Sequence, residues 1–277
     1  MLTMDKWIGD PKKVPARRKL VYTKDELVER LSEFRDRGWI TLTSHRQDKD
    51  GGLGNTLEDL LEIPENNIPI ADYGQFELKT HRTSSNSLIS LFRFEPKPGE
   101  MVPKLIRDYG WPIPKYGPME RSLRIDIDAA GFSERGFVAR IDNAIKRLEL
   151  HFDSTKVPNT ANYRDWLEEV SRRVGLGDLQ PVPYWDFDDL ESQIHRKIRN
   201  MVFVSVDTSR DGGRQKMRIA KAQLLQGADL SRLLDGITKG WLQIEFSART
   251  HHNHGTGFRT WERCWPNLYG SAELLLK

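Results

Sequence analysis

The chain has 277 residues, of which 38% are hydrophobic and 30% are charged, a composition that excludes an intrinsically disordered protein and provides for a sizeable core. Its 43 basic and 40 acidic residues leave a formal net charge of only +3, which excludes a histone-like polycation and permits a nucleic-acid partner without requiring one. With a single cysteine, Cys264, no signal-peptide pattern and no apolar run near the roughly 20 residues of a membrane span, we expect a cytoplasmic protein without disulfides.

The spacing of apolar residues in the first half of the chain predicts helices that alternate with strands. Thr23 and Glu26 form a capping-box pattern at the start of the first helix. Asn55 is the expected N-cap of a second, short helix. The expected elements are a helix over 23–38, a strand over 39–44, a helix over 55–63, a strand pair over 66–80 and a strand over 87–96.

The second half predicts more strands and three further helices, and together the two halves indicate a mixed α/β fold, α+β-like, with mostly antiparallel strands. The predicted elements change from strands to a helix between residues 150 and 160, so we expect one domain over 1–155 and another over 156–277. The expected elements are a hairpin of strands 121–129 and 136–142, a strand over 146–153, a helix over 162–175 capped by Asn162, a helix-to-strand unit over 186–209 and a helix–turn–strand unit over 227–249.

The stretch DYGQFELKTHR carries the pattern Asp-x4-Glu-x-Lys, formed by Asp72, Glu77 and Lys79. On a strand, Glu77 and Lys79 would share one face while Phe76 and Leu78 point into the core. Carboxylates converging from Asp72 and Glu77 would make an oxygen site of the kind that Mg²⁺ prefers. A neighbouring lysine can orient a water and stabilise the charge of a phosphodiester transition state. The alternative is that Glu77 and Lys79 simply face solvent.

Glu58 lies 14 residues before Asp72, on the short helix that Asn55 is expected to cap. It is either the glutamate of a capping box or a further acid directed at the same metal site.

The segment GGLGNTLEDLLEI…IADYGQFELKTHR resembles the active-site segment of MutH-like endonucleases, and most closely the MvaI/BcnI group of type II restriction enzymes in the PD-(D/E)xK nuclease superfamily. The resemblance implies a catalytic set of Glu58, Asp72, Glu77 and Lys79, with Asp72 and Glu77 binding Mg²⁺. His81 shares the face of Lys79 and either approaches DNA or lies at the rim of the site.

A second segment, SARTHHNHGTGFR, crowds three histidines, two glycines and two arginines behind an expected strand. Histidine and arginine carry donors that can read guanine in the major groove. A zinc site built from His251, His252 and His254 is an alternative, although no cysteine or acid stands at a suitable spacing. An ordinary surface loop is the other.

This segment is similar to the HNHGT-x-FR segment with which MvaI/BcnI-type enzymes contact base edges. The similarity implies that His252, Asn253, His254 and Arg259 contact DNA. Arg249 is a further candidate by position alone, and Glu245 is a guess for the acid that family members carry on the same strand.

Taken together, the two resemblances imply a type II restriction endonuclease with a PD-(D/E)xK core and two lobes around a DNA cleft. They imply a Mg²⁺-dependent monomer that cuts double-stranded DNA at a short, pseudopalindromic and GC-rich site, beside a companion methyltransferase in the host. Residues 1–155 would form the catalytic lobe with an N-terminal arm, and residues 156–277 the recognition lobe. The alternatives are a MutH-type nicking enzyme activated by a partner, a DNA-binding module without catalysis, and a zinc-stabilised interaction protein.

Overall fold

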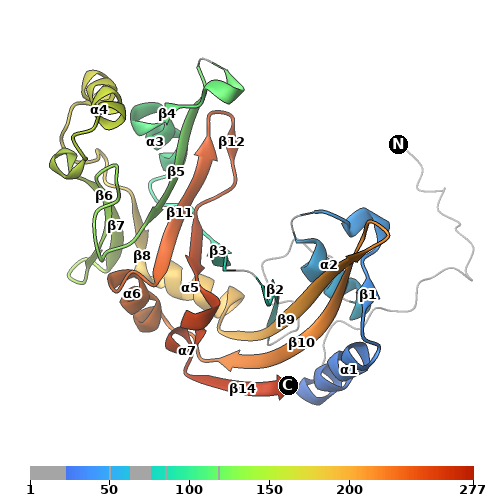
Figure 1. The fold of residues 1–277 in the computed structure, drawn as a ribbon. Coiled ribbons are helices and arrows are strands. Elements are labelled where there is room, and N and C mark those ends of the chain that lie inside the picture. The colour runs from blue at the N-terminus through green and yellow to red at the C-terminus, as the bar shows by residue number, and fades with distance from the viewer. Residues whose placement is uncertain (1–22, 50, 63–75, 85, 118) are drawn as a thin grey trace, which may run out of the picture.

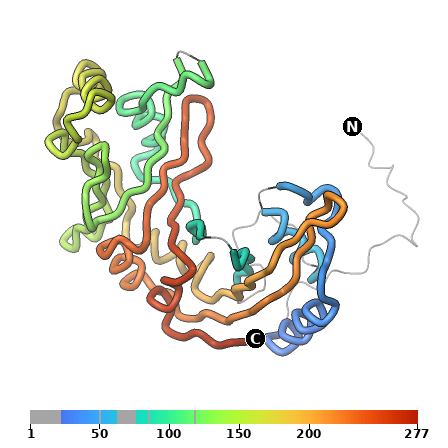
Figure 2. The backbone as a smooth tube through the Cα atoms, in the orientation of Figure 1, coloured from blue at the N-terminus to red at the C-terminus, as the bar shows by residue number. Residues whose placement is uncertain are grey.

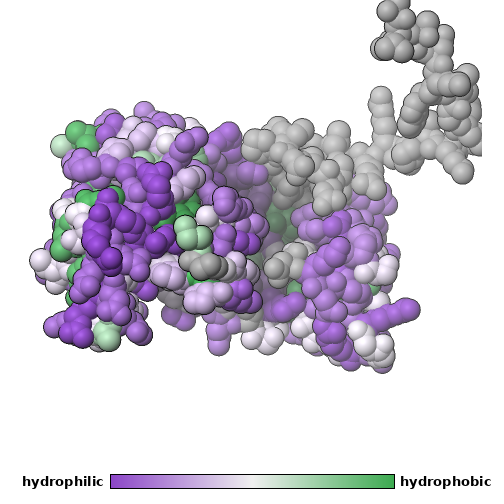
Figure 3. All heavy atoms as spheres, turned by 90° about the horizontal axis from the view of Figure 1, so that it is seen from above, coloured by the Kyte–Doolittle hydropathy of each residue, from purple (hydrophilic) through white to green (hydrophobic). Residues whose placement is uncertain are grey.

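The computed structural model describes residues 23–49, 51–62, 76–84, 86–117 and 119–277. Figure 1 shows these residues as two lobes that rise like the arms of a U, with the long strands β9 (Asn200–Asp211) and β10 (Arg214–Gln226) running from its base into one arm. We call the arm that holds these strands the small lobe and the other arm the large lobe. Seen from above, both lobes present a predominantly hydrophilic surface (Figure 3). None of the helices in the described ranges is long and apolar enough to span a membrane.

The small lobe is built on a five-stranded sheet in the order β1-β10-β9-β2, with β14 also paired to β10. Strand β2 runs parallel to β9, and every other strand pair of the described chain is antiparallel. The expectation of mostly antiparallel strands is therefore confirmed for these residues. The remaining elements of this lobe are β1 (Ile40–Thr41), β2 (Glu77–Arg82), β14 (Ser271–Leu276), α1 (Lys24–Asp36) and α2 (Gly52–Leu60).

The two helices of the small lobe begin in different ways. At α1 the expected capping box is present, because the Thr23 hydroxyl accepts from the backbone N–H of Glu26 while the Glu26 carboxylate accepts from the N–H of Thr23 at 3.0 Å. Helix α2 starts earlier than expected, since its N-cap is Gly51 in the left-handed conformation (φ 79°) and not Asn55. Glycine adopts this conformation without a steric penalty, so the chain can turn directly from the preceding loop into the helix.

The large lobe contains a six-stranded sheet in the order β3-β13-β11-β5-β4, with β12 paired to β11, and a three-stranded sheet in the order β6-β7-β8. The hairpin expected from 121–129 and 136–142 is wrong, because β5 pairs with β4 and β11 whereas β6 pairs with β7. The Asp128 carboxylate accepts from the N–H groups of Ala130 and Gly131 at 2.9 and 3.3 Å, and this turn directs the chain into a different sheet. The strands are β3 (Ile89–Arg93), β4 (Trp111–Pro112), β5 (Arg121–Ile127), β6 (Phe137–Asp142), β7 (Arg147–Phe152), β8 (Tyr184–Asp186), β11 (Leu242–Arg249), β12 (His252–Asn253) and β13 (Gly257–Thr260).

Five α-helices belong to the large lobe or to its junction with the small lobe, and the expected helices of the second half are among them. Thr160, not Asn162, is the N-cap of α4. The helices are α3 (Met101–Tyr109), α4 (Ala161–Val174), α5 (Phe187–Lys197), α6 (Leu230–Thr238) and α7 (Trp265–Leu268), and short 3-10 turns cover Ser44–Arg46, Pro114–Tyr116, Ser154–Lys156 and Glu262–Cys264.

Strand β9 lies between two hydrophobic cores and contributes side chains to both. Its side chains alternate in direction, so Val202 and Val204 enter the core of the small lobe with α1 and α2, while Met201 and Phe203 enter the core of the large lobe. Both lobes consequently draw on both halves of the chain: β9, β10 and β14 complete the small sheet, and β3 to β7 lie in the large lobe. The boundary expected near residue 155 does not separate the two sheets.

The C-terminal strand closes the small lobe against its first helix, as the tube in Figure 2 shows. Lys24 of α1 donates to Glu273 of β14 at 2.6 Å, and the Arg35 guanidinium donates to the carbonyl of Lys277 at 3.1 Å.

Candidate active site and nucleic-acid interface

Strand β2 presents the motif glutamate and lysine on one face, as the spacing predicts. Leu78 is buried in the core of the small lobe. Glu77 and Lys79 lie on the opposite face, next to Met201 and Phe203 in the register with β9. Because this face of β9 looks toward the large lobe, the two charged side chains lie where the lobes meet.

The carboxylate of Glu77 is only 6% exposed and accepts a hydrogen bond from Lys79 Nζ at 2.7 Å. Tyr269 lies close by, and its pKa is raised well above the ordinary value, first by burial and then by the negative charge of Glu77. A carboxylate in such a dry environment is stabilised by nearby positive charge, which Lys79 supplies in part and a divalent cation would supply in full. The site therefore fits a hard metal ion with Glu77 as one ligand.

Of the two other acids in the predicted catalytic set, the structure describes only Glu58. Asp72 lies outside the described residues. Glu58 is half-buried on α2, which packs against β2. Since Gly51 is the N-cap, Glu58 is too far along the helix to serve in a capping box, and that interpretation is wrong. Within the described ranges no three histidine, cysteine or acidic side chains converge as metal ligands.

His81 continues the face of Glu77 and Lys79, but its ring is used inside the protein. Its Nδ1 lies 3.2 Å from Oε2 of Glu262, whose other oxygen lies 3.5 Å from the hydroxyl of Ser205. Only 12% of the His81 side chain is exposed. Contact between His81 and DNA stays a prediction, and it would require this arrangement to open.

The large sheet offers an open polar face on its two central strands. Alternate side chains of β11 and β5 enter the core, as Phe246 and Leu123 do. The side chains of the other face stand in three cross-strand pairs, which are Arg249 with Ser122, Ser247 with Arg124, and Glu245 with Asp126.

The two arginines predicted to contact DNA are both held by carboxylates. Arg249 donates to Glu120 at 3.2 Å and lies over the ring of Tyr116, 4.5 Å from its centre. Arg259 forms a charged hydrogen bond with Glu245 and donates to the carbonyl of Leu88 at 2.8 Å. These contacts restrict the guanidinium groups to defined directions, which reduces the rotamer freedom that they would lose on meeting a ligand.

An acidic pair lies beside Arg259 on the same face. The pair consists of Asp126 and Glu245. The pKa of Asp126 is raised, first by desolvation of its carboxylate and then by the negative charge of Glu245, while the positive charges of Arg259 and Arg124 act to lower it. Glu245, the acid guessed for this strand, forms an ion pair with Arg259 and so orients its guanidinium group.

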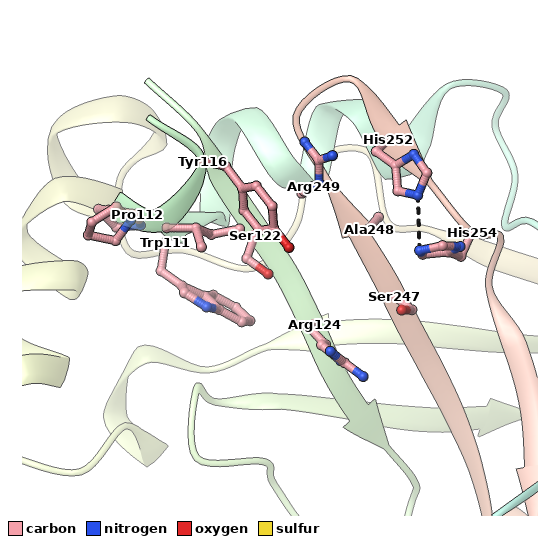
Figure 4. A pocket seen from close by; sticks show the side chains of 12 residues that line it. Trp111, Pro112, Tyr116, Ser122, Arg124, Ser247, Ala248, Arg249, His252 and His254 are labelled. Carbon is pink, nitrogen blue, oxygen red and sulfur yellow. Dashed lines mark hydrogen bonds between the residues drawn. The ribbon is translucent and has the colours of Figure 1, made fainter. Parts of the chain in front are cut away.

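The segment 251–255, which we call the histidine loop, is largely exposed and contains hydrogen bonds between its own residues. The Nε2 atoms of His252 and His254 lie 3.0 Å apart, with the two rings nearly perpendicular (Figure 4). Asn253 donates to Glu95 at 3.0 Å and accepts from the N–H of Gly255 at 2.8 Å, so its amide holds the loop. Two imidazole nitrogens meet here, but no third histidine, cysteine or acidic side chain of the described residues joins them in a group that could hold a metal ion.

A recess of about 470 Å³ opens between this loop and the start of β5 (Figure 4). Aromatic rings line one side of it and cationic or hydrogen-bonding side chains the other. The residues concerned are Trp111, Tyr116, Arg124, Arg249, His252 and His254. Stacking surfaces beside such donors are typical of nucleic-acid interfaces.

Several residues of these sites carry no recognisable signal in the sequence. Glu95, Glu120 and Glu262 each hold a predicted site residue from a distant part of the chain, and the sequence separation reaches 181 residues for Glu262 and His81. Arg124 belongs to the polar face only through the register of β5 with β11.

A buried carboxylate–lysine pair where two lobes meet, in a chain whose larger sheet carries arginine and histidine on an open face, is the arrangement expected of a DNA-cleaving enzyme of mixed α/β fold. The family model of the MvaI/BcnI restriction endonuclease family matches residues 28–269, and the chain belongs to this family. It is a type II restriction endonuclease, a site-specific deoxyribonuclease.

Solved structures show the same fold. The restriction endonuclease MvaI in complex with its cognate DNA substrate is similar with a TM-score of 0.74 at 22% identity, over 92% of this chain and 100% of that chain. MvaI in the absence of DNA is similar with a TM-score of 0.52 at 22% identity, over 90% of this chain and 96% of that chain. No curated protein matches this chain.

Proposed function

We propose that the chain is a Mg²⁺-dependent enzyme that cuts double-stranded DNA at a short, pseudopalindromic, GC-rich site, with Glu58, Asp72, Glu77 and Lys79 as its catalytic residues. The observation that carries the proposal is the 2.7 Å bond between Lys79 and the buried Glu77 on the strand facing the large lobe. A protein that only binds DNA has no need of such a pair.

In the proposed reaction a water oxygen attacks the phosphorus, the bond from phosphorus to the 3′ oxygen breaks, and the products are a 5′-phosphate and a 3′-hydroxyl. Mg²⁺ held by Asp72 and Glu77 would neutralise phosphate charge and favour ionisation of water. The Lys79 ammonium, held by Glu77, is positioned to orient the water and to stabilise the negative charge that develops on the phosphoryl oxygens.

His252, Asn253, His254, Arg249 and Arg259 are proposed to contact DNA from the large lobe, and the fixed directions of the two guanidinium groups support this. Arg259, held by Glu245, suits the bidentate contact that arginine makes with guanine. We further propose a cytoplasmic monomer, with a methyltransferase of the same specificity protecting the host DNA.

The experiment is to incubate the protein with supercoiled plasmid DNA or phage DNA and Mg²⁺ and to sequence the fragment ends, beside Lys79→Ala and the control Lys239→Ala. Lys239 lies at the end of α6 in a surface ion pair with Asp235 at 2.9 Å. Discrete ends at one motif, lost in Lys79→Ala and retained in the control, are the expected result. Binding to one motif without cutting would favour the non-catalytic module. Feeble nicking of supercoiled DNA would favour the partner-activated enzyme.

A further inference from the structure

Arg124 is an exposed arginine near the middle of the open face of the large sheet. It makes no hydrogen bond or ion pair with any residue in the described ranges, whereas Arg249 and Arg259 are each bound to a carboxylate. A guanidinium group without an internal partner keeps all five of its donors for a ligand.

The register of the strands places Arg124 among the predicted DNA-contacting residues. Its cross-strand neighbour is Ser247, a small residue two positions before Arg249. Figure 4 shows the side chain of Arg124 extending along the same side of the sheet as Ser247 and His254. Space beside the serine leaves the long side chain unobstructed.

Arg124 lies between two recesses. One, of about 470 Å³, is lined also by Arg249, His252 and His254. The other, of about 650 Å³, is lined also by Glu245 and Arg259. A ligand that touches both groups of predicted residues must therefore pass over Arg124.

The backbone that carries Arg124 is suited to reading bases. Strand β5 is paired with β4 at Arg121 and Ser122 and with β11 along residues 122–127, so the backbone that carries Arg124 is part of a hydrogen-bonded sheet. Long side chains that stand on the open face of β5 and β11 can approach base edges in a major groove about 12 Å wide. The bidentate contact of arginine with the O6 and N7 atoms of guanine is the commonest specific contact there.

We propose that Arg124 is a specificity-determining residue that reads a guanine in the major groove, which makes β5 a second reading strand beside β11. The inference rests on the proposed function, because it requires that this face binds the target DNA. A phosphate contact is the competing role, and the two roles differ chemically. A phosphate contact needs mainly positive charge, which lysine retains, whereas guanine recognition uses the planar fork that lysine lacks.

The experiment compares wild type with Arg124→Lys and Arg124→Ala, and with Arg140→Lys and Arg140→Ala as matched controls. Arg140 is also exposed on a strand, β6, and makes no ion pair within the described ranges. Each protein selects its preferred sequences from a random DNA pool without Mg²⁺, and cleavage rates are then measured on the cognate site and on every single-base-pair variant.

Both Arg124 variants are expected to lower cleavage of the cognate site by about tenfold to a hundredfold and to lose preference at one base pair, with the other positions still discriminated. The Arg140 variants should match wild type. Because the Arg124 side chain has no partner among the described residues, the melting temperature should stay at the wild-type value.

Two results would overturn the inference while leaving the proposed function intact: unchanged sequence preference, or a uniform loss on all sequences that Arg124→Lys restores. If wild type selects a motif but does not cut it, the catalytic part of the proposed function fails and the Arg124 variants still decide the inference from the selected sequences. If wild type selects no motif, both fail.

Discussion

At the scale of single residues, several of the predicted site residues are bound by carboxylates. Lys79, Arg249, Arg259 and Asn253 are bound by Glu77, Glu120, Glu245 and Glu95, respectively. A long polar side chain loses rotamer freedom when it meets a ligand. Holding it beforehand reduces that loss, so these acids prepare the site although they need not touch DNA.

Glu95 is the clearest case, because it accepts from Asn253 Nδ2 at 3.0 Å and from the N–H and hydroxyl of Thr256 at 3.1 and 2.9 Å. Glu95→Ala should free the histidine loop and reduce cognate cleavage about tenfold or more, mainly through weaker binding. Titration of cognate DNA by fluorescence anisotropy measures this. Glu95→Gln keeps one acceptor oxygen, enough for the bonds from Asn253 Nδ2 and the N–H of Thr256, and should retain more of the affinity than Glu95→Ala. Equal affinities for wild type and Glu95→Ala would show that the loop does not depend on Glu95.

Glu262 links the lobes through His81, and its removal should cost stability. Glu262→Ala leaves the largely buried ring of His81 without its acceptor, at a cost of about 1–3 kcal/mol in the free energy of unfolding. Urea denaturation of both proteins tests this. The control is Glu33→Ala, which removes a partly exposed pair with Arg30 at 2.8 Å and should cost about 1 kcal/mol or less. Similar costs for the two variants would contradict a special role for the contact.

At the scale of elements, the start of α2 depends on a second glycine, Gly52, beside the N-cap Gly51. A Cβ on Gly52 would collide with the carbonyl oxygen of Arg46, while a Cβ on Gly54 would meet nothing within 4 Å. Gly52→Ala should therefore displace the helix that carries Glu58, lowering the free energy of unfolding by about 1–3 kcal/mol and slowing cleavage.

Gly54→Ala is the matched control for the start of α2. It should be neutral or stabilising by up to about 1 kcal/mol, because alanine favours a helix more than glycine does. Thermal unfolding and initial cleavage rates measure both variants. Equal melting temperatures and cleavage rates for the two alanine variants would show that the close approach of Arg46 does not restrict position 52 to glycine.

At the scale of the whole molecule, the formal net charge of +3 does not describe the interface. This sum of 43 basic and 40 acidic residues does not say where on the surface the charged side chains lie. Cognate binding should still weaken by about a thousandfold or more between 50 and 200 mM salt if six or more phosphates are contacted. The slope of log K against log salt, measured without Mg²⁺, gives this number directly. A flat slope would mean that the basic side chains do not meet phosphates.

The proposed Mg²⁺ requirement also belongs to this scale, because it would separate cutting from sequence-specific binding. Removing divalent cations with a chelator should abolish cutting and leave motif-specific binding in place, since the proposed base contacts lie in the large lobe. Cleavage followed by gel electrophoresis, together with a gel-shift assay, measures both quantities. Cutting that persists in the chelator would overturn the proposed role of Mg²⁺.

The sequence by itself determined local features of this protein. The capping box of α1, the alternation of β2 that places Glu77 and Lys79 together, and most helices and strands follow from spacings of a few residues, because backbone geometry sets which neighbours share a face. Two short segments were also enough to indicate the family, and the match over residues 28–269 confirms it.

Tertiary structure alone decided which strands are neighbours. Local patterns predicted a hairpin of 121–129 with 136–142, but strand partners depend on contacts between distant segments, and β5 lies beside β11. The same applies to the interleaving of the two lobes across residue 155, to the pairing of His81 with Glu262 and to the position of Arg124 opposite Ser247. Such contacts form only when the cores close, so no spacing along the chain encodes them.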